Sequence, residues 1–275
     1  STPLYSSAAS DVHKRQVYIE SARNLSIEVR NGDVETVEES SSQGVGFRVF
    51  KEGKMAFSHC NDFEDSSLDN AISRAVGFAG ITTPDENNVL PEEMGITEVE
   101  GLYDSSIINV SMDEKIALAK EVEQMAMKDS RITKSAGSGY GEGEGAIYLS
   151  NSRGLSKNYK MSACSFGVSV VAEKGEQKSS GGEYCSRRFY ADLKKPDEVA
   201  AKAAEDAYSM LDPRMIKTQK ATVIFDPDVS RSLLGGILAA VNGERVLQGA
   251  SFLMNSIDKK IASELINLID DGTLS

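Results

Sequence analysis

Glycine occupies every second position of the sequence from Gly137 to Gly145. A period of two residues is the period of a β-strand, because successive side chains of a strand point to opposite faces of the sheet. The run therefore predicts a strand with one bare face, which another backbone can approach closely. Two explanations are open: the face is a channel for an extended peptide, or the glycines only allow tight packing of the sheet.

The glycine run also matches the phosphate-binding pattern G-x-G-x-x-A, which ends at Ala146. A phosphate-binding loop of this kind leads directly into the N-terminus of a helix. The segment that follows here, from Ala146 to Leu149, is strand-like instead. We therefore do not interpret the run as a dinucleotide-binding loop.

The secondary structure of the first 217 residues can be predicted from apolar periodicity, caps and turns. Apolar and polar residues alternate between Val17 and Cys60, with an Asn-Gly hairpin signal at Asn31. Ser111 and Glu114 form a capping box, which predicts a helix through Lys128. The other predicted features are helices at 68–79 and 197–211, strands within 131–188, and turns at 152–154, 174–176 and 180–182.

The order of these elements is typical of an α+β fold rather than of alternating βαβ units. We expect an N-terminal domain of antiparallel strands with packed helices at residues 17–217. The polar stretch at 217–220 indicates a boundary. We expect residues 218–275 to be the incomplete beginning of a second, mostly β domain, with a buried strand at 222–225, a helix at 228–241, an apolar strand at 265–269 and an uncovered apolar face.

The first sixteen residues have no apolar period of either the helical or the strand kind. The stretch from Asp11 to Gln16 resembles a hexapeptide that a common sequencing adapter encodes, with His13 in the place of a tyrosine. We interpret residues 1–16 as a non-native leader that is excluded from the fold. The alternative is a natural terminus with little order.

Composition and charge narrow the possible functions. Thirty basic and forty-two acidic residues give a net charge of −12, which disfavours nucleic acid and anionic lipid as ligands. The longest apolar run, from Leu233 to Val241, is far shorter than the roughly 18 residues of a membrane span. The three cysteines indicate thiols in a reducing compartment rather than a disulfide framework, so we expect a cytoplasmic protein.

Few residues suggest catalysis or metal binding. His59 and Cys60 are adjacent, so on a strand they point to opposite faces and cannot hold one ion together. Cys164 and Cys185 could face each other across strands, but they lack metal-binding spacing and are expected to be small buried apolar residues. We expect solvated or helix-capping roles for the acidic clusters Asp62, Glu64, Asp65 and Asp270, Asp271.

Six short blocks occur in a characteristic order along the chain. They are residues 29–35, 44–49, 149–154, 223–227, 249–253 and 269–272. No block is specific alone, but the ordered set resembles the TldD/PmbA family, once named modulators of DNA gyrase and regarded as subunits of a two-protein metalloprotease. The resemblance implies a helix before Val17 and a large β domain after Ser275.

The resemblance also implies a role for this chain. The catalytic member of the family carries His-Glu-x-x-x-His on a helix, and the matching stretch here has Gly235, Gly236 and Ala240 at the zinc-ligand and base positions. The chain is therefore similar to the PmbA/TldE side, with no cofactor and no catalytic residue of its own. The implied partners are a TldD-like subunit that binds zinc and an unfolded or leader peptide as substrate.

Two alternatives to this role remain. The chain could be a non-proteolytic binding or regulatory protein that acts on DNA gyrase or on a toxin–antitoxin pair. It could also be a paralogue that assembles with itself. The residues that contact a peptide are not predictable from the sequence.

Overall fold

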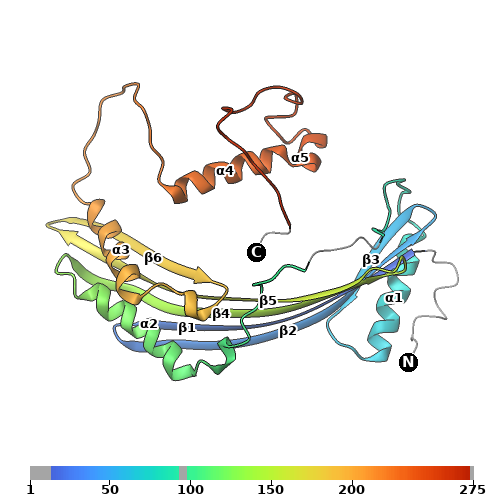
Figure 1. Ribbon diagram of the computed structural model, residues 1–275, viewed down its shortest axis with the longest axis horizontal. Helices are drawn as coiled ribbons and strands as arrows, with labels where there is room; N and C mark the ends of the chain where they lie inside the picture. Colours follow the sequence, from blue (N-terminus) through green and yellow to red (C-terminus); the bar gives the residue numbers. More distant parts are fainter. Residues whose placement is uncertain (1–13, 93–97, 273–275) are drawn as a thin grey trace. The chain divides into compact units, whose positions relative to one another are not determined.

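The computed structural model describes residues 14–92 and 98–272, which form two compact units (Figure 1). The first unit ends at Pro213 and the second begins at Arg214. Residues 1–13 of the predicted leader lie outside the described residues, whereas Lys14 to Gln16 belong to the first strand.

The first unit is built on one antiparallel sheet of six strands, in the order β3-β2-β1-β4-β5-β6 (Figure 1). The hairpins β1–β2, β2–β3, β4–β5 and β5–β6 are local, and β1 pairs with β4 across the middle of the sheet. The α+β fold is confirmed. The strands are β1 Lys14–Arg30, β2 Asp33–Lys51, β3 Lys54–Cys60, β4 Ile132–Asn151, β5 Ser156–Lys174 and β6 Gln177–Arg187.

Three helices of the first unit were predicted and are present. They are α1 Asp65–Ala79, α2 Met112–Met127 and α3 Pro196–Ser209. The capping box of α2 is confirmed, because Ser111 Oγ accepts a hydrogen bond from Glu114 N at 3.2 Å and Glu114 Oε2 accepts one from Ser111 N at 2.8 Å. Two short 3₁₀ turns, η1 Ile107–Asn109 and η2 Tyr190–Asp192, complete this unit.

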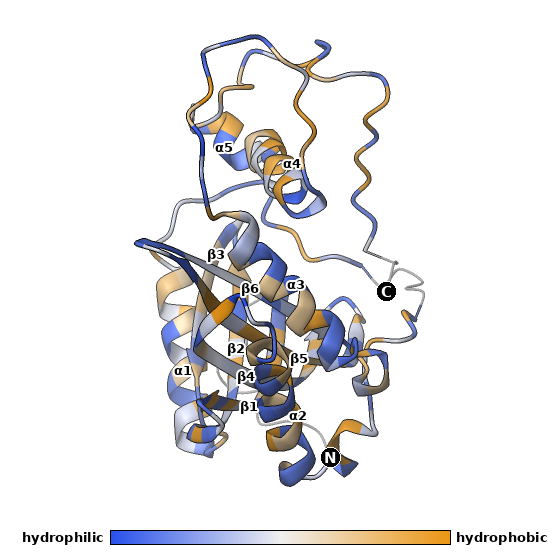
Figure 2. Ribbon diagram, turned by 90° about the vertical axis from the view of Figure 1, so that its left-hand side faces the viewer, coloured by the Kyte–Doolittle hydropathy of each residue, from blue (hydrophilic) through white to orange (hydrophobic). Residues whose placement is uncertain are grey.

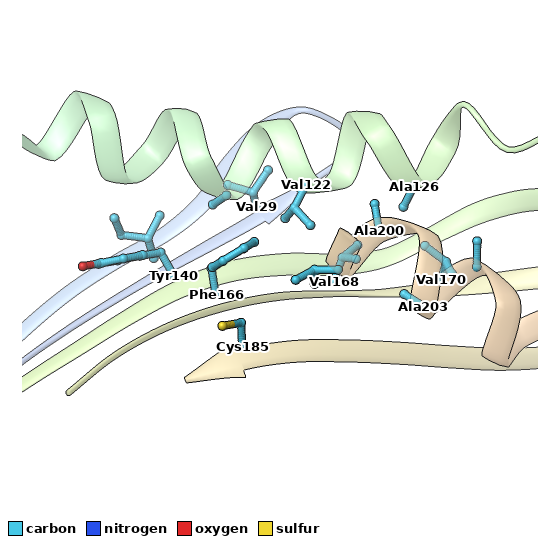
Figure 3. Packing of buried hydrophobic residues seen from close by; sticks show 14 of the residues in the cluster. Val29, Val122, Ala126, Tyr140, Phe166, Val168, Val170, Cys185, Ala200 and Ala203 are labelled. Atoms are coloured by element: carbon cyan, nitrogen blue, oxygen red, sulfur yellow. The ribbon is translucent and has the colours of Figure 1, made fainter. Parts of the chain in front are cut away.

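All three helices cover the same face of the sheet. Val17 and Ile19 of β1 pack with α1, whereas Ile27 and Val29 lie in the larger core cluster with α2 and α3. These are odd-numbered residues of a strand whose pairing with β4 has no register shift, so they share one face. Figure 3 shows Val122 of α2 and Ala203 of α3 packed among buried side chains of β5 such as Val170.

The predicted turn at 180–182 is wrong, because these residues lie within β6. Gly181 pairs with Val170 of β5, which is fully buried beneath the helices. A Cβ atom at Gly181 would lie 2.1 Å from the backbone nitrogen of Ala207 in α3. The glycine is therefore required by the contact of α3 with the sheet rather than by a turn.

The second unit contains α4 Pro227–Val241 and α5 Gly243–Leu247. The predicted helix is confirmed, but the predicted strands at 222–225 and 265–269 are wrong, since no strand occurs among the described residues of this unit. A strand needs a partner to satisfy its backbone groups, and Ile224 is 92% exposed. As expected, apolar side chains of α4 and of the segments around it are exposed. Figure 2 shows the hydrophobic residues of α4 in orange.

Among the described residues, no helix has the length and apolar character that crossing a membrane requires.

The turn between α2 and β4 provides a pH-dependent contribution to stability. Three Asp129–Arg131 hydrogen bonds, two from the Arg131 side chain and one from its backbone N–H, lower the pKa of Asp129 to about 2. A carboxyl group whose pKa is lower in the folded state than in the unfolded state stabilises the fold at pH values above its unfolded-state pKa. This stabilisation is lost as the pH falls through its folded-state pKa. We therefore expect Asp129→Asn to cost about 1–2 kcal/mol at pH 7.

The difference between Asp129→Asn and the wild type should shrink between pH 5 and pH 2. Urea unfolding of both proteins across this range measures it. A difference that stays constant with pH would contradict the assigned ion pair.

Candidate functional site

The glycine run forms the middle of the sheet and faces away from the helices. It lies in β4, between β1 and β5. Tyr140 and Glu142 are buried on the helix side, so the alternating Gly139, Gly141 and Gly143 point to the other side. We call this side, opposite α1, α2 and α3, the open face.

Small residues of the neighbouring strands continue the bare surface. Ser26 of β1 and Ser165 of β5 flank Gly141, and Gly167 of β5 lies beside Gly139. Together they line a shallow groove of ≈ 760 Å³, which Tyr184 of β6 borders. A groove floored by glycine and serine exposes backbone rather than bulky side chains, and this suits an extended polypeptide.

Two glycines of this face are required by close packing within the sheet. A Cβ atom at Gly139 would lie 2.7 Å from the carbonyl oxygen of Ile27, and one at Gly167 would lie 2.7 Å from that of Glu183. No side chain fits at these distances without movement of the backbone. Tight packing therefore accounts for Gly139 and Gly167, whereas the nearest atoms to a Cβ atom at Gly141 and Gly143 belong to side chains, at 3.3 and 3.0 Å. The explanation by tight packing thus applies at Gly139, and the channel for an extended peptide stays a prediction.

The middle of the open face has little charge. We consider residues 22–28 of β1 and the residues of the neighbouring strands that pair with them. The charged side chains that point to the open face there are Glu28 on β1 and Glu38 on β2. Toward one end, Tyr18 and Tyr159 make the surface aromatic, and burial, followed by a hydrogen bond to Glu20, raises the pKa of Tyr18. The described residues of this face include no nucleophile–base pair.

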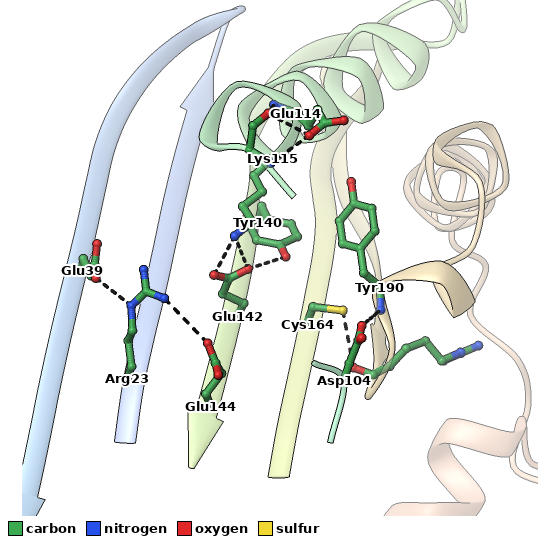
Figure 4. Close-up of polar contacts among 12 residues, drawn as sticks. Arg23, Glu39, Asp104, Glu114, Lys115, Tyr140, Glu142, Glu144, Cys164 and Tyr190 are labelled. Atoms are coloured by element: carbon green, nitrogen blue, oxygen red, sulfur yellow. Dashed lines mark hydrogen bonds and ion pairs between the residues drawn. The ribbon is translucent and has the colours of Figure 1, made fainter. Parts of the chain in front are cut away.

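A buried polar network holds the glycine strand from the helix side (Figure 4). Lys115 Nζ of α2 lies 2.7 Å from Glu142, and both side chains are about 5% exposed. Tyr140 Oη donates a hydrogen bond of 2.8 Å to Glu142, and burial, followed by this bond, raises the pKa of Tyr140. Arg23 forms further ion pairs on this side with Glu39 and Glu144.

Sequence reasoning missed this network. Its only signal is the alternation of Glu142 and Glu144 with the glycines, which places two carboxylates on one strand face. The residue that neutralises Glu142 lies 27 positions away, on α2. The pairing of α2 with β4 is a tertiary contact that no local pattern specifies.

The cysteines and the histidine of β3 do not form a metal site. His59 is exposed and stacks on Phe57, with ring centroids 6.0 Å apart, whereas the neighbouring Cys60 packs against the core cluster of α1. Cys164 lies opposite Arg187 and Cys185 lies opposite Phe166, so the two thiols do not face each other directly. Both are free and buried, and burial raises the pKa of Cys164 to about 11.

The acidic cluster at 62–65 lies at the start of α1. Asp62 Oδ1 accepts a hydrogen bond from Glu64 N at 3.0 Å. Glu64 occupies the N-cap position and Asp65 lies in the first turn, where a negative charge is favourable. Asp270 and Asp271 lie outside helices and strands.

The stretch Gly235 to Ala240 lies in α4 and does not fit a zinc ion. Gly235, Gly236 and Ala240 have no side-chain nitrogen, oxygen or sulfur with which to bind one. The two glycines border open space, and Ala240 is buried. Within 14–92 and 98–272, no group of three or more His, Cys, Asp or Glu residues is placed to hold a metal.

Comparison with known proteins identifies relatives along almost the whole chain. A metalloprotease PmbA of Escherichia coli O157:H7 is 29% identical over 255 residues, which are 92% of this chain and 57% of the relative. A protein of Bacteroides thetaiotaomicron, described as a candidate modulator of DNA gyrase, has a crystal structure that matches with a TM-score of 0.83 at 28% identity. That match covers 93% of this chain and 59% of the other.

TldE from Thermococcus kodakarensis has the same fold, with a TM-score of 0.63 at 17% identity over 73% of this chain and 45% of TldE. The chain thus spans little more than half the length of the relatives it matches. Its sequence matches PmbA/TldA metallopeptidase domain 1 at residues 16–79, the central domain at 105–211 and the C-terminal domain at 218–275. The chain therefore belongs to the PmbA/TldA (TldD/PmbA) metallopeptidase family.

Proposed function

We propose that this chain is the PmbA/TldE-like, non-metal subunit of a two-subunit metallopeptidase. Its open face holds an unfolded or leader peptide in an extended conformation, and a TldD-like partner supplies the zinc that cleaves it. The observation that carries the proposal is the combination of a bare glycine groove with a helix α4 that offers no metal ligand at Gly235, Gly236 and Ala240. We expect the protein to act in the cytoplasm as part of a heterodimer.

The test is cleavage of an unstructured peptide by the full-length protein, with and without a co-expressed partner that carries His-Glu-x-x-x-His. Each combination is assayed with and without a chelator. Cleavage only with the partner, abolished by the chelator, would support the proposal. Chelator-sensitive cleavage by the protein alone would refute the non-metal role.

The groove makes a specific prediction for the same assay. Ser26 is exposed beside Gly141, and an aromatic side chain at this position would cover the bare strand without a clash in the core. We expect Ser26→Trp to raise the KM for the peptide about tenfold, equivalent to about 1.4 kcal/mol of lost binding, with a smaller effect on kcat. An unchanged KM would show that the peptide does not lie over Gly141.

Ser209→Trp serves as the matched control for Ser26→Trp. Ser209 is exposed at the C-terminal end of α3, away from the open face, so its replacement should leave the KM unchanged. A similar loss in both variants would point to a general effect of the added aromatic surface.

A second candidate function is binding or regulation without proteolysis, and the description of the B. thetaiotaomicron relative favours it. In that case the protein would capture DNA gyrase directly, independently of the partner's zinc motif. A pull-down of gyrase that persists when this motif is mutated would favour regulation. The net charge of −12 makes direct DNA contact unfavourable in either case.

A further inference from the structure

The two edges of the sheet differ in how they are covered. β3 pairs only with residues 45–51 of β2, so the preceding half of β2, residues 33–44, has a neighbour on one side alone. We call residues 33–44 the β2 edge. All of them except Gly44 are exposed. Within the described parts of the chain, no backbone hydrogen bond outside the sheet pairing involves residues 34–43.

An unpaired edge of this length is a ready template for another strand. Outward-pointing N–H and C=O groups of an edge can bond a further strand, and proteins normally blunt such edges with charges, bulges or covering segments. The pairing of the β2 edge with β1 is regular except for a register shift near the hairpin, between Glu28 and Val29 of β1. Val34 and Val37 on this edge are 38% and 47% exposed, so apolar surface is available next to the free backbone.

The charge of the β2 edge indicates which kind of strand can pair with it. It carries Asp33, Glu35, Glu38 and Glu39 and no basic residue. Arg30 and Arg23 of β1 pair with Glu35 and Glu39, whereas Glu38 points to the open face without an ion-pair partner among the described residues. A second copy would bring glutamates against glutamates, and like charges on paired strands are destabilising.

We propose that the β2 edge binds an extended, lysine- or arginine-containing segment of another polypeptide as a seventh strand of the sheet. Backbone hydrogen bonds to residues 33–44 supply the affinity, and cross-strand contacts to Glu38 and its acidic neighbours supply the preference for basic segments. The opposite edge strand, β6, carries charges of both signs, because it contains Lys178, Glu183 and Arg187. This inference goes beyond the proposed function, since it requires neither a zinc subunit nor cleavage.

The test uses the chain alone and a fluorescent nine-residue peptide that alternates lysine with threonine. We expect saturable binding by fluorescence anisotropy and slower hydrogen exchange of backbone amides within residues 33–44. A peptide with glutamate in place of lysine should not bind. A lysine peptide with N-methyl groups at alternate residues keeps its charge but loses strand pairing, so it should not bind either.

A charge-reversal pair of variants locates the contact. Glu38→Lys on the β2 edge should weaken binding of the lysine peptide about fivefold, as expected when an attractive cross-strand charge pair becomes repulsive. Glu176→Lys changes the net charge equally, but it lies on the exposed β5–β6 turn and should have little effect. If both variants weakened binding of the lysine peptide equally, the effect would depend on net charge alone. This result would overturn the proposal.

Three further results would overturn the proposal. They are absence of binding, equal binding of the N-methylated peptide, and a concentration-dependent dimer of the chain that itself protects residues 33–44 from exchange. The last result would assign the edge to a second copy. Since no step involves cleavage, failure here leaves the proposed peptidase role to be decided by its own assay.

Discussion

Gly181→Ala is expected to destabilise the first unit by about 3 kcal/mol, at the upper end of the usual cost of overpacking. The added Cβ atom would lie 2.1 Å from Ala207 N and 2.6 Å from Ala203 O, and both atoms belong to the backbone of α3. A helix backbone cannot yield as a flexible side chain can, so α3 must move away from β6. Urea unfolding followed by far-UV circular dichroism measures the change.

Gly77→Ala is the matched control for this substitution. Gly77 lies on the exposed side of α1, and a Cβ atom there would meet nothing within 4 Å. Alanine favours helix over glycine by about 0.8–1 kcal/mol, so Gly77→Ala should be stabilising. If Gly181→Ala were also neutral or stabilising, the direct contact of α3 with β6 would be disproved.

The elements that the sequence predicted correctly have local causes. The capping box at Ser111 needs only residues within one helical turn. The hairpin at Asn31 and Gly32 needs positive φ angles, and these residues have φ values of 54° and 81°. The glycine run likewise defines its own period. Each of these signals is complete within a few residues of the chain.

The incorrect predictions concern structure that depends on distant residues. A Gly-Gly pair is typical of turns, yet Gly181 and Gly182 lie in β6, because β5 pairs with them on one side and α3 packs against Gly181. Residues 222–225 have the composition of a buried strand, but no strand pairs with them in the described part of the second unit. Propensity alone cannot supply a pairing partner.

The candidate site also has one part that the sequence predicts and another that depends on distant residues. The bare face was predictable from Gly137 to Gly145, because alternation fixes which positions share a face. The groove borders, such as Tyr184 of β6, follow from strand order, which the sequence leaves open. The contact of Lys115 with Glu142 depends on how α2 lies over the sheet, and this is set by packing of the whole core.

Lys115→Met is expected to cost about 3–5 kcal/mol, because it leaves the carboxylate of Glu142 buried without its cation. The side chains of Lys115 and Glu142 are 6% and 5% exposed, so water cannot replace the lost partner. Tyr140 Oη still donates to Glu142, but a neutral hydroxyl does not balance a full charge. Chemical unfolding of the variant measures the loss, since the network connects α2 directly to the glycine strand.

The double variant Lys115→Met/Glu142→Gln separates the charge from the packing. It removes both charges and keeps an acceptor for Tyr140 Oη, so it should recover most of the lost stability. Lys202→Met, which removes an exposed ion pair with Asp206 on α3, should change stability by less than about 1 kcal/mol. If the double variant were as unstable as Lys115→Met, the stem of Lys115 rather than its charge would hold α2 to β4. The polar network would then not be what positions the floor of the groove.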